Sequence, residues 1–265
     1  MEVVSLDDPR DPRVDDYRAL TGPGRGRRRD AFVVEGLNPI RLLLASRFRT
    51  RSLLLATSAL DTLRDDLPRI PDGVPVYAAS HALLRTITGF DFHGGHLAIG
   101  ERATDPALAE LLAPPGDRVL VVMERLANPD NVGGVLRNAF AFGAGAALLS
   151  PGCADPLYRR AIRVSMGSAL VVPFATLADW PQDLAHVRGA GYTLVALTPR
   201  ADAVDIASVE ARRVALLVGH ESDGLGRPAL SSADVAARIP MAPGVDSLNA
   251  AAASAVALHR LTAWR

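Results

Sequence analysis

The sequence lacks the usual features of secreted, membrane-spanning and metal-binding proteins. Cys153 is the single cysteine, so no disulfide bond can form within the chain. The first residues contain neither the basic nor the apolar region of a signal peptide, and no apolar run reaches the roughly 18 residues of a membrane span. Apart from His93 and His96 the histidines are scattered, which gives a zinc site little support. We expect a soluble, cytoplasmic protein without a metal ion.

Lysine is absent, and aromatic residues make up only 5% of the chain. The shortage of aromatic rings argues against a base-stacking platform for single-stranded RNA. The formal net charge is zero, but residues 18–51 hold nine arginines against two carboxylates. A phosphate-binding role is our interpretation of the densest part of this segment, and a solvated loop is the alternative. That part contains Arg25, Arg27, Arg28 and Arg29.

Motifs of several common enzyme classes are also missing. The chain contains no GxxxxGK[ST] phosphate loop and no GxSxG nucleophile elbow. The glycine-rich stretch at residues 219–226, GHESDGLG, does not fit the GxGxxG pattern of dinucleotide-binding folds. These absences leave nucleotide hydrolysis, serine hydrolase chemistry and dinucleotide binding without support.

The hydrophobic content of 49% is sufficient for a sizeable core, and the pattern predicts two α/β domains. The first, residues 1–105, begins with a polar arm or short helix and includes an amphipathic helix at 59–67. Residues 106–117 predict a linker with a short helix. The second domain, residues 118–265, alternates between strands and helices in the manner of a mostly parallel sheet with helices on both faces. The predicted strands are 31–36, 52–57, 74–80, 96–102, 119–124, 146–150, 170–175, 192–198, 213–219 and 236–240.

The last predicted helix is rich in small residues. Pro240, Pro243 and Gly244 forbid a regular element, and a run of alanines and other good helix formers follows from Ser247 onward. We predict that Ser247 is the N-cap of this helix, whose free N–H groups would attract an anion or a carboxylate. Because residues 250–258 are small or apolar, the helix is expected to be buried close to other backbone.

Three polar loops follow predicted strands of the second domain. They are residues 128–131 (NPDN), 219–226 (GHESDGLG) and 240–249. Ligands of open parallel sheets bind outside the carboxyl ends of the strands, so we expect these loops to form one site.

The sequences around these loops carry a family resemblance. The segments NPDNVGGVLRNA (128–139), LLVGHESDGLG (216–226) and IPMAPGVDSLNAAAASAVAL (239–258) resemble the three motifs of the SpoU, or TrmH-like, branch of the SPOUT RNA methyltransferases, in the same order and spacing. FVVEG at 32–36 is similar to the opening of the L30e-like substrate-binding domain that many of these enzymes carry.

The resemblance implies S-adenosylmethionine-dependent methylation of a ribose 2′-hydroxyl in ribosomal or transfer RNA. It also implies a homodimer whose C-terminal chain forms a trefoil knot, and the L30e-like domain favours ribosomal RNA. A non-catalytic RNA-binding protein of ribosome assembly on the same scaffold is the alternative.

The resemblance further implies roles for individual residues. Arg137 is the main catalytic residue, Asn131 supports it and Glu221 is an orienting carboxylate, whereas Ser247 and Asn249 face RNA or the cofactor. A guanidinium stays protonated, so we expect Arg137 to bind the adjacent phosphate and polarise the 2′-oxygen while the proton leaves to water or a neighbouring carboxylate. A compatible structural role of Arg137 is an ion pair with Glu221.

Two positions depart from the family pattern. His220 stands where asparagine is common, and Asn128 stands where aspartate is frequent. Neither position is assigned a catalytic role.

The cofactor pocket is expected to consist mostly of backbone at strand ends. Gly219 would allow close approach of the cofactor, although an ordinary strand-end turn also explains this glycine. The expected cofactor-binding residues are Ala196, Leu197, Thr198, Gly219, Ile239, Met241, Ser247 and Leu248.

Overall fold

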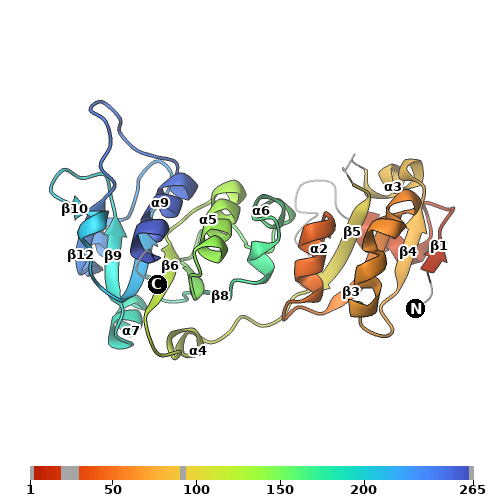
Figure 1. Cartoon of the computed structure of the whole chain (residues 1–265), viewed down its shortest axis with the longest axis horizontal. Helices are drawn as coiled ribbons and strands as arrows, with labels where there is room; N and C mark the ends of the chain where they lie inside the picture. Colours follow the sequence, from red (N-terminus) through yellow and green to blue (C-terminus); the bar gives the residue numbers. More distant parts are fainter. Residues whose placement is uncertain (1–2, 19–29, 90–93, 263–265) are drawn as a thin grey trace. The chain divides into compact units, whose positions relative to one another are not determined.

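The protein consists of two compact units whose boundaries differ in one segment from the predicted domains. The computed structural model describes residues 3–18, 30–89 and 94–262 (Figure 1). One unit contains residues 1–104 together with 157–171, and the other contains 105–156 and 172–265. Residues 157–171, which we assigned to the second domain, therefore pack with the first.

The described residues of the first unit form a five-stranded mixed sheet in the order β1-β4-β3-β5-β2. β1 and β3 run parallel to β4, whereas β5 pairs antiparallel with β3 and β2. The expected polar arm thus contributes an edge strand, and the amphipathic helix predicted at 59–67 is a 3-10 helix, Thr57–Arg69. The strands are β1 Val3–Ser5, β2 Ala31–Glu35, β3 Thr50–Ala56, β4 Val76–Ala79 and β5 His96–Glu101. The α-helices are α1 Asp15–Arg18, α2 Leu37–Leu44, α3 His81–Thr88 and α6 Arg159–Val164.

The later segment of the first unit is held by a salt bridge and by close packing. Nε and one terminal nitrogen of Arg159, on α6, donate to the Oε2 atom of Glu35 at 3.1 and 2.7 Å. A Cβ atom at Gly167 would lie 2.8 Å from the Cα atom of Pro39, so this position has no room for a side chain. The predicted strand at 170–175 starts later, at Phe174, because residues 168–170 form a 3-10 turn that packs on α2.

The described residues of the second unit form a seven-stranded sheet in the order β10-β12-β9-β11-β6-β7-β8. Every pairing between these strands is parallel, in agreement with the predicted parallel architecture. The strands are β6 Arg118–Met123, β7 Ala146–Leu149, β8 Phe174–Thr176, β9 Thr193–Leu197, β10 Val204–Asp205, β11 Arg213–Val218 and β12 Val235–Arg238. The α-helices are α4 Leu108–Leu112, α5 Pro129–Ala141, α7 Leu184–Gly189, α8 Arg227–Ser232 and α9 Ala250–Thr262.

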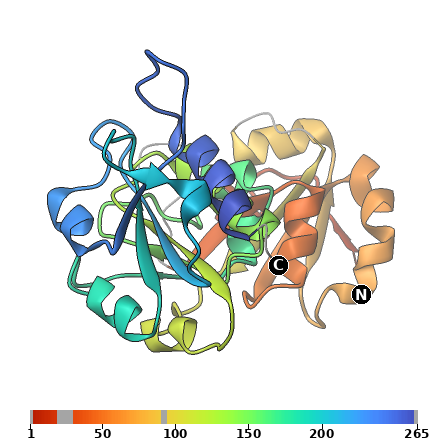
Figure 2. The ribbon, with the colours of Figure 1, turned by 60° about the vertical axis from the view of Figure 1, so that its left-hand side comes forward.

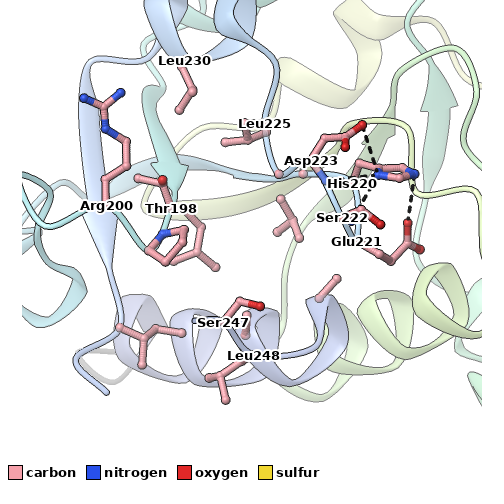
Figure 3. A pocket seen from close by; sticks show the side chains of 18 of the residues that line it. Thr198, Arg200, His220, Glu221, Ser222, Asp223, Leu225, Leu230, Ser247 and Leu248 are labelled. Atoms are coloured by element: carbon pink, nitrogen blue, oxygen red, sulfur yellow. Dashed lines mark hydrogen bonds and ion pairs between the residues drawn. The ribbon is translucent and has the colours of Figure 1, made fainter. Parts of the chain in front are cut away.

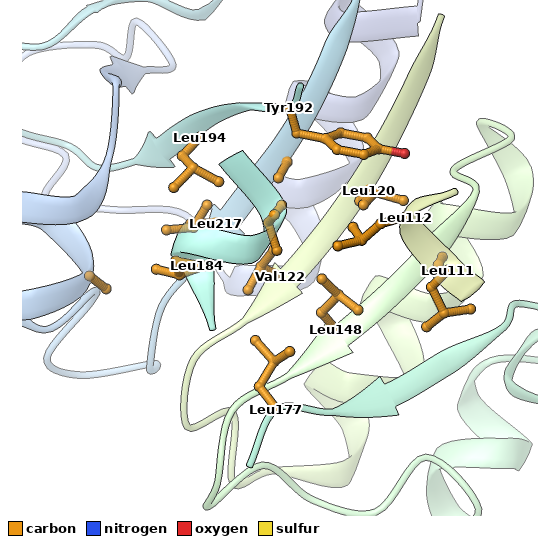
Figure 4. Packing of buried hydrophobic residues seen from close by; sticks show 14 of the residues in the cluster. Leu111, Leu112, Leu120, Val122, Leu148, Leu177, Leu184, Tyr192, Leu194 and Leu217 are labelled. Carbon is orange, nitrogen blue, oxygen red and sulfur yellow. The ribbon is translucent and has the colours of Figure 1, made fainter. Parts of the chain in front are cut away.

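One face of the second sheet carries a core of leucine, valine and alanine side chains (Figure 4). Alternate residues of the central strands, such as Leu120 and Val122 on β6, point into it. Leu111 and Leu112 of α4 belong to the same core, so the predicted linker at 106–117 is partly built into the second unit.

Arg213 fixes the rest of that predicted linker. Its guanidinium donates to the carbonyl oxygens of Leu112, Pro114 and Gly116 at 2.9 to 3.2 Å. It also lies over the ring of Tyr192, with Cζ 4.2 Å from the ring centroid. The end of the linker therefore follows a defined path along the second unit.

The other face of the sheet is covered in part by two closely packed helices, α5 and α9. A Cβ atom at Gly134 of α5 would lie 2.6 Å from the Cβ atom of Ala251 on α9. The Asn138 side chain donates to the Ala251 carbonyl oxygen at 2.6 Å and to the Ser254 hydroxyl at 2.9 Å. The prediction that small residues bring the last helix close to other backbone is confirmed. The prediction that this helix is buried holds for one face only, because Ala252 and Val256 are exposed on the other.

The loop between β12 and α9 extends away from the second unit (Figure 2). Residues 242–249 of this loop are all exposed. Within the part of the chain that the structure describes, no helix is long and apolar enough to cross a membrane.

Candidate functional site

A cavity of about 360 Å³ lies at the carboxyl ends of β9 and β11 in the second unit (Figure 3). The loops after β9, β11 and β12 form its walls, and the first turns of α9 close one side. Two of the three predicted site loops, 219–226 and 240–249, therefore line one cavity, and the third, 128–131, is linked to it by hydrogen bonds. The lining residues are Leu197–Arg200, Val218–Leu225, Leu230, Ile239, Met241, Ser247, Leu248, Ala250 and Ala253.

Seven of the eight expected cofactor-binding residues line this cavity. They are Leu197, Thr198, Gly219, Ile239, Met241, Ser247 and Leu248. Ala196 does not line it. Successive side chains of a strand point to opposite faces, and the Ala196 side chain lies in the core with Leu194 and Leu217.

Gly219 is required by the turn that it begins. A Cβ atom at this position would lie 2.2 Å from the carbonyl carbon of Gly224 and from the nitrogen of Leu225. The turn is closed by two backbone hydrogen bonds between His220 and Gly224, at 3.0 and 2.9 Å. The close approach of the Gly224–Leu225 backbone thus explains why this position is glycine, without reference to a ligand.

His220 is a cavity residue to which we assigned no role. Its Nδ1 atom accepts the backbone N–H groups of Ser222 at 3.2 Å and Asp223 at 3.4 Å, so a neutral ring carries its proton on Nε2. The Nε2 atom lies 3.6 Å from the Oε2 atom of Glu221. Figure 3 shows the ring between the carboxylates of Asp223 and Glu221. The only sequence signal for this residue was its departure from the family pattern.

A chain of side-chain hydrogen bonds connects three of the predicted catalytic residues. The amide of Asn131, which is only 5% exposed, donates to the Oε1 atom of Glu221 at 2.7 Å. The amide of Asn249 donates to the Oδ1 atom of Asn131 at 2.8 Å. Asn131 is thereby brought into contact with Glu221, 90 positions later in the sequence, and with Asn249, 118 positions later.

Asn249, and not Ser247, caps the last helix. The Oδ1 atom of Asn249 accepts the N–H groups of Ala251 at 2.9 Å and Ala252 at 3.4 Å. α9 begins only at Ala250, so the Ser247 hydroxyl lies too early in the chain for this role. The prediction of Ser247 as N-cap is wrong, and its side chain instead faces the cavity.

Arg137 stands apart from the cavity of its own chain. It is exposed on α5 and does not line the cavity. Its guanidinium forms no hydrogen bond or ion pair with any residue that the structure describes. The expected ion pair with Glu221 is not formed, and the Oε1 atom of that carboxylate accepts the amide of Asn131 instead. Arg25, Arg27, Arg28 and Arg29 lie outside the described residues.

Comparison with known proteins identifies relatives of the second unit and of the whole chain. Residues 118–259 match the SpoU rRNA Methylase family. An uncharacterized tRNA/rRNA methyltransferase of Mycobacterium tuberculosis is 40% identical over 270 residues, which cover 99% of this chain and 92% of that protein. The 23S rRNA (guanosine-2′-O-)-methyltransferase RlmB of Ralstonia nicotianae is 30% identical over 199 residues, which cover 73% of this chain and 78% of that protein.

A solved structure matches the fold over nearly the whole chain. The crystal structure of an AdoMet-bound rRNA methyltransferase from Sinorhizobium meliloti superposes with a TM-score of 0.81 and 28% sequence identity. The superposition covers 98% of this chain and 97% of that one.

The two candidate caps differ in their expected contribution to stability. Asn249→Ala removes the cap of α9 and the bond to Asn131, so we expect the free energy of unfolding to fall by about 1–2 kcal/mol. Ser247→Ala is the matched control and should change it by less than about 0.5 kcal/mol. Urea denaturation of both variants measures the difference, and an equal loss from the two would contradict the assignment of the cap.

Proposed function

Because the chain belongs to the SpoU rRNA methylase family, we propose that it transfers the methyl group of S-adenosylmethionine to a ribose 2′-hydroxyl of ribosomal RNA. One observation carries the proposal: the three motifs, far apart in sequence, meet through the bonds of Asn131 to Glu221 and Asn249 beside a cavity of suitable size. The name of the Ralstonia relative supports a 2′-hydroxyl of ribosomal RNA as the acceptor.

The cavity suits S-adenosylmethionine in size and chemistry. Its volume of about 360 Å³ lies within the range of small-molecule sites. Leu197, Ile239 and Leu248 offer apolar contacts for the adenine, and Asp223 offers negative charge for the cationic methionine end. When bound, this cofactor supplies an electrophilic methyl group. The protein's contribution is then to orient the ribose hydroxyl and to remove its proton.

Arg137 is proposed to act on the RNA rather than on the cofactor. An exposed guanidinium that forms no ion pair or hydrogen bond with any described residue is available for bidentate binding of a phosphate. Holding the phosphate next to the methylated ribose would help to orient the 2′-oxygen for attack on the methyl group. This role requires no deprotonation of the arginine.

We propose further that the first unit is an L30e-like domain that selects the RNA and that the C-terminal chain forms a trefoil knot. The mixed sheet and covering helices of the first unit are compatible with the former. The latter is supported by the course of the last segment, which leaves β12 near one edge of the sheet and returns to pack α9 against α5 and the central strands.

A Gly134-centred contact explains how α5 and α9 pack, but both helices also expose apolar side chains. Phe140 on α5 is 47% exposed and Val256 on α9 is 40% exposed. Beside them, the rings of Phe142 and His259 meet edge to face at 5.8 Å. Burial of this surface in a homodimer would remove it from water, and we propose such a dimer.

The proposed reaction is tested with S-adenosylmethionine and total RNA. Calorimetry should show saturable binding of S-adenosylmethionine and S-adenosylhomocysteine, and mapping of 2′-O-methyl groups should reveal one ribosomal position. Arg137→Ala should slow methyl transfer by about 100-fold or more without changing cofactor affinity, because it removes an RNA contact.

Arg212→Ala is the control for that variant. Arg212 is an exposed arginine paired with Asp117 at the opposite end of β11, so its replacement should leave the rate unchanged. A methylation rate for Arg137→Ala equal to that of the control would show that Arg137 takes no part in the reaction. Absence of cofactor binding in the presence of RNA would refute the methyltransferase assignment.

The arginine cluster of the first unit is proposed to bind RNA phosphates. Replacing Arg27, Arg28 and Arg29 by glutamine should weaken RNA binding and reduce the slope of log K against log salt by about 0.7 for each lost phosphate contact. Cofactor affinity should stay the same. Filter binding at several salt concentrations measures both quantities.

A matched triple variant controls for charge alone. Arg10, Arg13 and Arg64 belong to the same unit, and each is already paired with a neighbouring aspartate. Their replacement by glutamine removes the same formal charge from arginines that are engaged elsewhere. Equal salt slopes for the two triple variants would show that the cluster does not bind phosphates and is a solvated loop.

The homodimer is tested by light scattering. We expect a mass of twice the 28.0 kDa of the chain, and Val256→Glu should give the monomer because it places a charge in the buried surface. Val204→Glu alters a valine that is 47% exposed on β10 and should leave the dimer intact. A monomeric wild-type protein at working concentration would exclude the proposed dimer.

A further inference from the structure

We propose that Glu221 accepts the proton of the ribose hydroxyl through its Oε2 atom and that His220 is the positioning residue for this oxygen. The inference rests on the proposed function and deepens it, because Arg137 stays protonated and methyl transfer to a hydroxyl must release a proton to another group.

Few cavity residues could take that proton. The titratable side chains that line the cavity in the described part of the chain are Arg200, His220, Glu221 and Asp223. Arg200 is a permanent cation that is paired with Asp202. Asp223 has a side chain that is 64% exposed and lies 3.9 Å from Arg125. Two residues, His220 and Glu221, remain.

The geometry of His220 disfavours it as the acceptor. A neutral imidazole accepts a proton only at its unprotonated nitrogen, which here is Nδ1. That nitrogen faces the backbone N–H groups of Ser222 and Asp223, and protonation would set three N–H groups against one another. The Nε2–H group of His220 instead faces Glu221. The Oδ2 atom of Asp223 lies 3.6 Å from Nδ1, beyond a full hydrogen bond, whereas the two backbone N–H groups occupy the lone pair of Nδ1.

The two oxygens of Glu221 differ in their surroundings. Oε1 accepts the side-chain amide of Asn131 at 2.7 Å and faces the backbone N–H of Asn128 at 3.4 Å. Oε2 lies 3.6 Å from the His220 ring, beyond a full hydrogen bond, and the side chain is 27% exposed at the cavity. One oxygen is therefore anchored, and the other retains lone pairs for an incoming hydroxyl.

The anchor is itself rigid. Asn131 is fixed by the amide of Asn249, whose Oδ1 atom caps α9. On the other side, the two backbone bonds between His220 and Gly224 hold the turn that carries Glu221. The carboxylate is thus oriented before RNA binds, as efficient proton transfer requires.

The resulting step balances in atoms and charge. The O–H bond of the 2′-hydroxyl breaks, and its proton passes to Oε2 of Glu221. The ribose oxygen forms a bond to the methyl carbon, while the carbon–sulfur bond breaks and leaves its electron pair on sulfur. A sulfonium and a carboxylate are replaced by a neutral thioether and a neutral carboxylic acid, which later loses its proton to water.

Glu221→Gln tests the proton acceptor at constant shape. Glutamine can still accept the Asn131 bond but cannot take up the proton. We expect the single-turnover rate at saturating RNA and S-adenosylmethionine to fall by about 10²–10⁴-fold, whereas the affinity for S-adenosylhomocysteine stays within about threefold of wild type. A rate within about threefold of wild type would refute the assignment.

Chemical rescue separates proton transfer from a structural role. In Glu221→Ala, added formate should restore part of the rate in proportion to its concentration, whereas formamide, which has the same shape but no basic carboxylate, should not. Equal behaviour of the two additives, including no rescue by either, would make Glu221 a structural residue. A wild-type protein that forms no 2′-O-methyl nucleotide would instead refute the proposed function itself.

His220 is tested as the positioning residue by two replacements. His220→Leu removes the donor that faces Oε2 and should lower the rate by about tenfold at unchanged RNA and cofactor affinity. His220→Asn restores a side-chain N–H donor and should recover part of that loss. A change in affinity alone, or identical rates for the two variants, would exclude this role.

Discussion

The close packing of α9 on α5 is the constraint on which the site depends. At Gly134 the two helices leave no space for a Cβ atom beside Ala251, and Asn138 ties the helices together through the same residue. This contact sets the beginning of each helix beside the other. Only then does Asn249, at the start of α9, reach Asn131 in the first turn of α5.

The turn after β11 completes this arrangement from the opposite direction. Gly219 lets the chain fold tightly over itself, and the turn presents Glu221 to Asn131 and His220 to Glu221. The start of α5, the start of α9 and the turn after β11 thus meet at a single polar centre. The cavity lies beside that centre and is lined by both apolar and polar residues.

Local sequence was sufficient to predict most of the helices and strands, although β1 and β10 were not predicted as strands. It did not predict which residues each element contacts. The strands β6 and β11 and the small-residue helix α9 follow from hydrophobic runs and helix propensity. Ser247 and Asn249 are equally good caps by residue type, and the choice depends on where the helix begins relative to Asn131.

Other errors have the same origin. The strand pattern places Ala196 at a strand end, but the face that Ala196 occupies depends on which side of the sheet is the core. The helical spacing of residues 159–164 does not reveal which unit they join, because that depends on Glu35 and Pro39, more than a hundred positions earlier.

The division of the chain also separates its charges. The first unit has 18 arginines against 14 carboxylates, whereas the second has 11 arginines against 15 carboxylates. A polyanion is therefore attracted by the first unit and repelled, on average, by the second. The net charge of zero is the sum of these opposite balances. Contacts between RNA and the second unit must therefore depend on individual side chains and backbone groups and not on its net charge.

The placement of residues 157–171 in the first unit, between two stretches of the second, has an evolutionary consequence. The chain passes between the units three times, so neither unit corresponds to one uninterrupted stretch of gene. Recombination at a single point near residue 104 would pair an N-terminal unit from one ancestor with a segment 157–171 from another, and Glu35 and Pro39 would face an unmatched surface. The two units of this protein are therefore expected to have diverged together.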